Sequence, residues 1–501
     1  MSGKKLFAVD LGASGGKCFA GIFEGDSFSM REVHRFEHEG VTFFIPDGEG
    51  RVTQRDHWDD VLLYDNIVKG LQTYRREFSD HLDTIGIDTW GADGHFVNPD
   101  GEMLGKIYCY RDHRLDNMID EVKSRIDPRR VYEITGIHFQ PFNVSNQLRW
   151  FVRNRRDLIR PGSSFLPIPT VFYYYLGGAK KVDSSWASVT QLMDARKKEW
   201  SEEILRKLEI PPEVMPEIVE PGTVIGKLHK QLAESTGINQ ADLMAVGAHD
   251  TASAFAAAPI QNASEALIIS SGTWSLVGKL VPEPITSEEA MDANVSNEGG
   301  IGNTRCLLNC MGTWLVQELR RNWAREDGRE MSWEEITRLA SSAPPFGSLV
   351  DPDDASFYNP DDMQKAIADF CGRTAQPVPS DRGAFLRLVY ESLALKYRVV
   401  NERICSVSDS KTTAVNIVGG GSKNDLLNRL TASAVGLPVV AGPEEATAAG
   451  NLMVQARGLG IINSMEEALP IIKQAFPIRE YRPEDSDAWK QAYDRFVKIL
   501  S

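Results

Sequence analysis

The sequence predicts a protein of the α/β class with roughly two to four domains, because a chain of 501 residues is too long to fold around one core. Short apolar runs typical of strands alternate with longer segments whose apolar residues have helical spacing. One pattern occurs both near the N-terminus and after the midpoint: an apolar strand ends in a polar glycine turn and leads into a second strand. This repetition indicates two halves with a related design.

Composition restricts the classes of partner. The chain has 55 Lys and Arg against 70 Asp and Glu, and its net charge of −15 argues against nucleic acid or an anionic membrane as a partner. No apolar run approaches the ~18 residues needed to span a bilayer, so we expect a cytoplasmic protein without a membrane partner. The six cysteines form no Cys-x-x-Cys pair, which indicates neither a zinc site nor a disulfide framework.

The first glycine turn follows an apolar strand over residues 6–9 and precedes a second strand over residues 18–23. Because this turn joins two strands, it differs from a dinucleotide or Walker loop, which opens a helix. Gly15 and Gly16 allow backbone N–H groups to converge on an anion such as phosphate. An ordinary hairpin with polar turn residues is the alternative interpretation.

The rest of the first half shows ordinary α/β features. We expect a surface helix over residues 56–78, a strand over residues 84–87 and a hairpin turn at residues 98–101. The charged segment 111–114 is interpreted as a solvated loop, with a substrate-facing loop as the alternative. The aromatic residues at 172–175 are assigned to the core.

The residues at the middle of the chain, 244–258, show a strand, a glycine turn and a helix of small residues. The turn delivers His249, Asp250 and Thr251 at the start of the helix, where the dipole favours negative charge. Asp250 would then be ionised and able to accept a proton. The alternative is that Asp250 or Thr251 only caps the helix. We place a domain boundary near residue 243.

The second half repeats the strand–turn–strand pattern over residues 266–275. We then expect a loop at residues 297–300, a buried strand over residues 306–310, and a helix that opens within residues 309–317. A long helix follows over residues 383–404, and then a strand over residues 414–418. The glycine turn at residues 419–424 opens an amphipathic helix, where an adenosine or phosphate can lie against bare backbone. A closely packed helix of small residues begins near residue 444.

Six short strings occur in one order along residues 6–460: VDLGAS at 9–14, IDTWG at 87–91, HDTASA at 249–254, SSGTW at 270–274, NEGG at 297–300 and GGGSKN at 419–424. The two phosphate-type hairpins and the glycine turn resemble the actin-like ATPase architecture, in which two ribonuclease-H-like domains close over ATP in the cleft between them. The central aspartate narrows the resemblance to the FGGY family of carbohydrate kinases. Within that family the strings are most similar to the rhamnulokinase group.

The resemblance implies an N-terminal actin-like domain over residues 1–243 with the sugar site and first phosphate turn, and a C-terminal actin-like domain over residues 244–501 with the catalytic aspartate and nucleotide site. It implies ATP-dependent phosphorylation of a ketose at its primary hydroxyl, L-rhamnulose to L-rhamnulose 1-phosphate, with L-fuculose or a related ketose as the alternative. The partners are the sugar and ATP, and the protein is a monomer or homodimer.

The resemblance also assigns roles to residues. Asp250 is the general base, and Asp10 holds the Mg²⁺ of MgATP through water. The residues expected to face the sugar are Gly91, His249, Asp250, Thr251 and Asn309. The residues expected to bind ATP are Ala13, Ser14, Gly15, Gly16, Lys17, Thr273, Gln317 and Gly420.

One departure from the family pattern concerns the sugar. Rhamnulokinases usually have an aromatic residue where this chain has Gly94, which is followed by His95. We expect Gly94 to leave space near the sugar, and His95 either to add a polar group there or to pack locally. Two other classes stay open: a non-catalytic sugar or nucleotide sensor on the same fold, and an actin-like ATPase or chaperone.

Overall fold

The computed structural model describes residues 3–25, 27–46 and 49–500, and the chain forms two compact units. Unit 1 contains the described residues up to Ala257 together with Val281–Cys306 and Thr447–Ala475. Unit 2 contains Ala258–Leu280, Leu307–Ala446 and the described residues from Phe476 onward. The chain therefore leaves unit 1 and returns to it twice.

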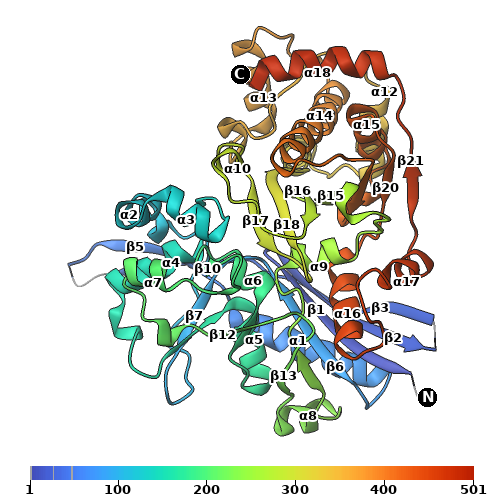
Figure 1. The fold of residues 1–501 in the computed structure, drawn as a ribbon. Coiled ribbons are helices and arrows are strands. Elements are labelled where there is room, and N and C mark those ends of the chain that lie inside the picture. The colour runs from blue at the N-terminus through green and yellow to red at the C-terminus, as the bar shows by residue number, and fades with distance from the viewer. Residues whose placement is uncertain (1–2, 26, 47–48, 501) are drawn as a thin grey trace. The chain divides into compact units, whose positions relative to one another are not determined.

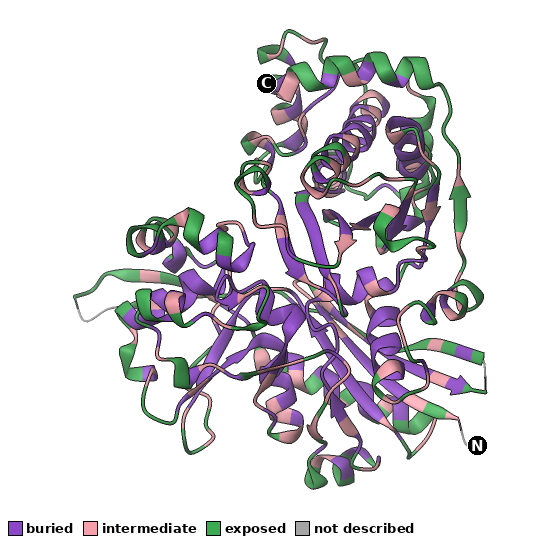
Figure 2. Ribbon diagram, in the orientation of Figure 1, coloured by how far each residue is buried: buried purple, intermediate pink, exposed green. Residues whose placement is uncertain are grey.

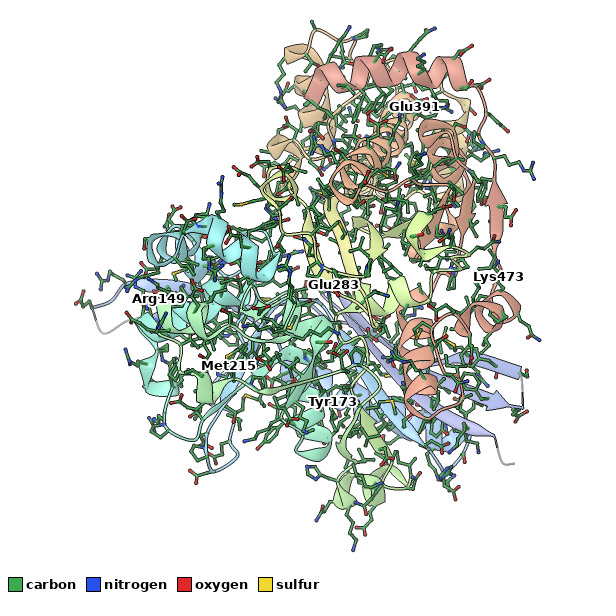
Figure 3. The ribbon with its side chains drawn as sticks, in the orientation of Figure 1. Arg149, Tyr173, Met215, Glu283, Glu391 and Lys473 are labelled. Atoms are coloured by element: carbon green, nitrogen blue, oxygen red, sulfur yellow. The ribbon has the colours of Figure 1, made fainter. Side chains whose placement is uncertain are left out.

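The division expected near residue 243 differs from these units. Residue 243 lies in strand β14 (Asp242–Met244), which pairs in parallel with β6 (Thr84–Thr89). The hydroxyl of Tyr173 also joins the two strands, because it accepts a hydrogen bond from Ile87 N at 2.7 Å and donates one to Met244 O at 2.6 Å (Figure 3). The chain at this point is thus an integral part of the sheet of unit 1.

Unit 1 is built on a six-stranded sheet with the order β13-β14-β6-β1-β2-β3 (Figure 1). Its strands are β1 (Lys4–Gly12), β2 (Gly15–Glu24), β3 (Ser27–Glu37), β6, β13 (Val224–Lys227) and β14. The first three strands run antiparallel to one another, whereas β6 lies parallel to β1 and β14 parallel to β6. The expected N-terminal hairpin is confirmed as β1–β2. Parallel pairing brings the carboxyl ends of β1, β6 and β14 to the same edge of the sheet.

Unit 1 also contains short strands and helices, of which β17 belongs to the seven-stranded sheet that includes β15 (Ala266–Ser271) and β16 (Trp274–Val281). The remaining strands are β4 (Val41–Pro46), β5 (Val52–His57), β7 (Gly94–Val97), β8 (Ser164–Pro167), β9 (Lys181–Asp183), β10 (Met193–Asp194), β11 (Glu199–Trp200), β12 (Glu217–Val219) and β17 (Ser296–Gly299). The helices are α1 (Asp60–Glu77), α2 (Met118–Arg125), α3 (Pro128–Thr135), α4 (Val144–Asn154), α5 (Ile168–Gly177), α6 (Ser184–Ser188), α7 (Glu202–Lys207), α8 (Lys230–Thr236), α9 (Asp250–Ala256), α10 (Glu288–Asp292), α16 (Ala446–Gly458) and α17 (Ala468–Ala475). Figure 2 shows the central strands buried and the outer faces of the helices exposed.

Unit 2 repeats the arrangement of an antiparallel hairpin beside parallel strands. Strand β15 (Ala266–Ser271) pairs antiparallel with β16 (Trp274–Val281) and parallel with β19 (Ala414–Val418). The sheet continues through β20 (Val439–Ala441), parallel to β19, and β21 (Arg479–Tyr481), antiparallel to β20. The expected second hairpin and the strand over 414–418 are confirmed.

The helices of unit 2 pack around this sheet (Figure 1). They are α11 (Trp314–Asp327), α12 (Trp333–Ser342), α13 (Met363–Arg373), α14 (Arg382–Ser408), α15 (Asp425–Val435) and α18 (Ser486–Leu500). Helix α14 confirms the long helix expected over residues 383–404. Helix α15 confirms the amphipathic helix after the glycine turn, and Asn424 caps it by accepting a hydrogen bond from Leu427 N.

Several local expectations were wrong. The helix expected from residue 56 begins at Asp60, because residues up to His57 form β5 and Asp59 is the N-cap. Residues 297–300 are mostly strand β17. The helix expected to open within residues 309–317 is confirmed, and it begins at Trp314, after β18 (Thr304–Met311). In the first two cases the residues pair with a neighbouring strand, β5 with β4 and β17 with β18.

The charged segment 111–114 is only partly solvated, because Arg111 and His113 are exposed but Asp112 and Arg114 are buried. The Arg114 guanidinium donates to Cys109 O at 2.9 Å and to Gln147 Oε1 at 3.1 Å, and it lies over the ring of Tyr108. A charged side chain is tolerated in the interior when its donors are paired. Of these partners, Gln147 lies 33 residues away, where the local pattern gave no sign of it.

Gly94 does not leave open space, contrary to expectation. A Cβ at this residue would lie 2.5 Å from Leu166 O and 2.5 Å from the ring of Phe165, on the paired strand β8. We expect Gly94→Ala to destabilise the protein by about 2 kcal/mol, because the paired backbone cannot move aside. Chemical denaturation measures the effect. The control is Gly226→Ala, where the nearest atom, Ala179 Cβ, is 3.7 Å from the added Cβ. Equal stability of the two variants would contradict the prediction.

Candidate active site

Asp250 is the first residue of helix α9, which follows β14 and the turn at Gly247. Its Oδ1 accepts hydrogen bonds from Thr251 N at 2.5 Å and from Thr251 Oγ1 at 3.0 Å. The side chain is 33% exposed. The N-cap is His249, whose side chain makes no capping hydrogen bond. The carboxylate is therefore held at the start of the helix, near the positive end of its dipole, and is still accessible to solvent.

His249 lies beside Asp250, with its Nε2 atom 3.4 Å from Asp250 Oδ1. It forms an isolated parallel bridge with Thr89, at the end of β6. Gly91 follows two residues later, and a Cβ there would lie 2.8 Å from His249 Nε2. The absence of a side chain at residue 91 thus leaves room for the imidazole ring. The structure brings together four of the residues expected to face the sugar.

Two further residues, Glu298 and Arg305, form the environment of the imidazole. His249 Nδ1 lies 3.1 Å from Arg305 Nη2 and 3.2 Å from Glu298 Oε2. Arg305 Nη1 lies 3.1 Å from the same Glu298 oxygen, and Arg305 is fully buried. Sequence reasoning quoted Glu298 only within a motif and missed Arg305. The available signal was an arginine inside an otherwise apolar strand.

The charges of this cluster depend on one another. Burial opposes ionisation of Glu298, but Arg305 and His249 outweigh it and lower the pKa of this carboxyl. Burial lowers the pKa of Arg305, whereas Glu298, Asp250 and Asp183 act against that decrease. An arginine stays protonated even so. The imidazole of His249 therefore lies next to a permanent cation, Arg305, which is paired with the buried carboxylate of Glu298.

A second group of acidic residues lies at the ends of β1 and β6. Asp10 and Asp88 are partners in the parallel register of these strands. Burial raises the pKa of Asp88 well above its ordinary range, and the negative charges of Asp10 and Asp250 raise it further. Asn451 of α16 opposes this shift by donating a hydrogen bond to Asp88 Oδ2 at 2.6 Å. The sequence analysis included Asp88 in a motif without giving it a role.

The magnesium ion that the resemblance implies fits these carboxylates. The buried Oδ1 of Asp88 has no hydrogen-bond partner among the described residues, and the adjacent Asp10 is a second hard oxygen donor. Among the same residues, no group of three or more His, Cys, Asp or Glu side chains is placed to hold a metal. Mg²⁺ does not require such a group, since it usually binds through one or two carboxylates, water and phosphate.

The hairpin of β1 and β2 carries the first predicted phosphate turn. It contains Ala13, Ser14, Gly15, Gly16 and Lys17. Strand β3 packs so closely against this turn that only glycine fits at residue 16, because a Cβ there would lie 2.2 Å from the ring of Phe36. His38 also holds the turn, since its Nε2 lies 2.8 Å from Gly12 O. The turn is therefore a rigid hairpin; its role as a phosphate site stays a prediction.

The hairpin of β15 and β16 in unit 2 carries the second turn. Gly272 N donates to Trp274 O at 2.8 Å, and Thr313 Oγ1 donates to Gly272 O at 2.9 Å. Gln317 Nε2 lies 3.3 Å from Thr273 Oγ1 and 3.0 Å from Thr313 Oγ1. Thr273 is exposed. The structure thus brings together Thr273 and Gln317, two residues predicted to bind the nucleotide.

The glycine turn after β19 approaches the end of β15. A Cβ at Gly421 would lie 2.1 Å from Ser271 Oγ, and Gly419 has a φ of 81°. At Gly420, by contrast, no heavy atom lies within 4 Å of the Cβ position. This leaves the Gly420 backbone accessible on one side. Asn309 lies elsewhere in unit 2, exposed on β18.

The fold matches those of solved two-domain sugar and glycerol kinases. A xylulose kinase from Lactobacillus acidophilus superposes with a TM-score of 0.78 at 16% identity, covering 99% of this chain and 97% of that chain. Glycerol kinase from Plasmodium falciparum, solved with ADP, gives a TM-score of 0.77 at 15% identity over 100% and 98% of the two chains. At this identity the likeness shows the fold.

The sequence comparisons define the family. The family model described as the N-terminal domain of the FGGY family of carbohydrate kinases matches residues 52–256, and the model of its C-terminal domain matches residues 267–459. A rhamnulokinase from Bacteroides thetaiotaomicron is 37% identical over 99% of both chains. One from Bacillus subtilis is 33% identical over 96% of both. This chain belongs to the FGGY family of carbohydrate kinases, as the sequence analysis expected.

No helix in the described part of the chain is both long enough and apolar enough to cross a bilayer.

Membership of the family identifies the protein as a kinase that transfers phosphate to a sugar hydroxyl.

His95 packs locally, which confirms one of the two alternatives given for it in the sequence analysis. It is 1% exposed, its Nε2 lies 2.6 Å from Leu104 O, and its ring contacts that of Phe151. Burial lowers the pKa of His95 from 6.5 to about 4. The imidazole is therefore neutral in the folded protein at neutral pH.

This pKa predicts a pH dependence of stability. Between pH 4 and 6.5 the unfolded state binds more protons at His95 than the folded state, so the stability contribution falls as pH decreases through this window. We expect His95→Gln, which can still donate to Leu104 O, to lose less stability between pH 7 and pH 4. The loss of unfolding free energy between pH 7 and pH 4 should be smaller in His95→Gln than in the wild type by on the order of 3 kcal/mol. Denaturation midpoints of the two proteins across this range measure it. A constant difference at all pH values would contradict the assignment.

Proposed function

We propose that the protein transfers the γ-phosphoryl group of ATP to the primary hydroxyl of L-rhamnulose and forms L-rhamnulose 1-phosphate. The observation that carries the proposal is an accessible carboxylate, Asp250, fixed at a helix N-terminus beside His249. Relatives named rhamnulokinase, at 33–37% identity over nearly the whole chain, support this choice of sugar.

Asp250 acts as the general base. Its hydrogen bonds from the described residues all reach Oδ1, which leaves Oδ2 to accept the proton of the sugar hydroxyl. The sugar oxygen then forms a bond to the γ-phosphorus as the bond to the β–γ bridging oxygen breaks, and ADP leaves. Phosphoryl transfer depends mainly on positioning and on neutralisation of charge.

The other residues position the two substrates. Gly91, His249, Thr251 and Asn309 are assigned to the sugar. The residues assigned to ATP are Ala13, Ser14, Gly15, Gly16, Lys17, Thr273, Gln317 and Gly420. Asp10, with Asp88 beside it, is assigned to the Mg²⁺ of MgATP, and this ion supplies charge neutralisation at the phosphates.

L-fuculose is the less favoured sugar. The reason to consider it was a polar His95 and an open Gly94 near the sugar. His95 instead contacts Leu104 O, and the Cβ position at Gly94 is filled by strand β8. Monomer and homodimer both remain compatible with the proposal.

Asp250→Asn tests the base. Asparagine keeps a hydrogen-bond acceptor of similar shape but cannot take the hydroxyl proton, so we expect kcat to fall by about 10² to 10⁴. The affinity for ATP should change little. The matched control is Asp242→Asn, at a half-buried carboxylate on β14 that pairs with Lys227, and it should keep kcat. Near-normal kcat in Asp250→Asn would reject the assignment of the base.

A panel of ketoses tests the substrate. With MgATP we expect kcat/KM for L-rhamnulose to exceed the values for L-fuculose and D-xylulose by at least about tenfold, since differences in several hydroxyl contacts separate these sugars. A coupled assay of ADP release gives the values. EDTA should abolish the activity, and added Mg²⁺ should restore it. ADP release that no ketose stimulates would favour a sensor or an ATPase.

A further inference from the structure

We propose that Arg305 is a positioning residue that holds His249 as the neutral tautomer with its hydrogen on Nε2, so that the ring presents a donor beside Asp250. The inference deepens the proposed function and rests on it for the identity of the sugar. All the groups involved lie in unit 1.

The guanidinium of Arg305 is held rigidly. Its Nε donates to Gly299 O at 2.9 Å, and Nη1 lies 3.1 Å from Glu298 Oε2. The remaining arm, Nη2, lies 3.1 Å from His249 Nδ1. Phe255 of α9 packs against the group, with its ring centroid 5.9 Å from the central carbon. Because Nε is hydrogen-bonded to β17 and Nη1 is ion-paired with Glu298 of the same strand, Nη2 is directed at the imidazole.

This contact determines the proton position on the imidazole. A guanidinium can only donate hydrogen bonds, so His249 Nδ1 must accept and must carry no hydrogen. Glu298 Oε2 lies 3.2 Å from the same nitrogen and could accept from a protonated Nδ1. However, this oxygen also lies 3.1 Å from Arg305 Nη1, so its charge is already paired with the guanidinium, whereas the contact from Arg305 to Nδ1 has hydrogen-bond geometry. The geometry thus selects the tautomer with hydrogen on Nε2.

In this tautomer, His249 Nε2 is a hydrogen-bond donor next to Asp250. Nε2 lies 3.4 Å from Asp250 Oδ1 and faces the bare Cα of Gly91. A hydrogen there can be donated either to the Asp250 carboxylate or to a sugar oxygen held next to it. Histidine with the opposite tautomer would present only an acceptor at this point. Arg305 thus acts on the bound sugar through His249 and does not touch it.

Stability alone does not account for this buried ion pair. Replacing such a pair by apolar residues of similar volume is often neutral or stabilising, because both ions lose their hydration. The residues that follow Arg305 in the strand are apolar, with Cys306, Leu307 and Leu308 all buried. A role in orienting His249 explains why an arginine occupies this position.

A double-mutant cycle tests the role in positioning. Arg305→Lys keeps the charge but cannot reproduce the planar fork, so we expect KM for the ketose to rise about tenfold while KM for ATP is unchanged. His249→Gln places an amide donor near the position of Nε2 and does not depend on a ring tautomer. In that background we expect Arg305→Lys to change KM for the ketose by less than about twofold. Equal effects in both backgrounds, or no effect in the wild type, would overturn the proposal.

Arg149→Lys is the matched control (Figure 3). Arg149 is also buried, and its Nε donates to Glu121 Oε1 at 2.9 Å while Nη1 lies 3.1 Å from Glu209 Oε2. It lies on α4, away from His249 in the sequence and outside the residues assigned to either substrate. We expect Arg149→Lys to affect stability as much as Arg305→Lys and to leave KM for the ketose unchanged.

Nitrogen-15 NMR of the histidine rings tests the tautomer without any measurement of activity. With His249→Gln used for assignment, we expect the Nδ1 signal of His249 in the wild type to have the shift of an unprotonated nitrogen at neutral pH, and Nε2 that of a protonated one. A protonated Nδ1 would overturn the proposal, whether or not Arg305→Lys folds. If the wild type phosphorylates no ketose, the proposed function fails, and the NMR result still decides the tautomer.

Discussion

The backbone of helix α16 approaches that of α9 so closely that only glycine fits at residue 450. A Cβ there would lie 1.8 Å from Ser253 O. This approach lets Asn451 reach Asp88, and lets Gln455 reach Phe7 O at 3.1 Å on the neighbouring strand. The helix that carries Asp250 and the strands that carry Asp10 and Asp88 are therefore fixed by one layer of side-chain amides. The geometry of the carboxylates depends on this packing.

Electrostatics within unit 1 divides the site into two kinds of environment. At one end, burial raises the pKa of Asp88, and the negative charges of Asp10 and Asp250 raise it further. On the other side of Asp250, the pair of Arg305 and Glu298 surrounds His249 with a fixed cation and a fixed anion. Asp250 interacts with both environments, because its charge acts on Asp88 and its Oδ1 lies 3.4 Å from His249 Nε2. This arrangement suits phosphoryl transfer, in which protein groups mainly position and neutralise.

The two units share one strand arrangement, but it positions different residues in each. In each, an antiparallel hairpin lies next to a parallel strand, so that a tight turn and a strand end come to one edge of the sheet. In unit 1 that edge holds Asp10 and Asp88. In unit 2 it holds Thr273, whose hydroxyl contacts Gln317 at the first turns of α11, and the accessible backbone of Gly420.

The sequence by itself determined the elements whose signals are local. Glycine turns between apolar runs predicted both hairpins, and the triplet at 249–251 identified the start of α9, because turn and helix preferences act over a few residues. Tertiary structure decided what depends on distant partners. Strand pairing made residues 297–299 part of β17, and packing buried Arg114 and filled the space beside Gly94. The same is true of Arg305 and Asn451, whose roles come from contacts with His249 and Asp88. These partners are 56 and 363 residues away, and no periodicity in a single sequence records which distant side chains will meet.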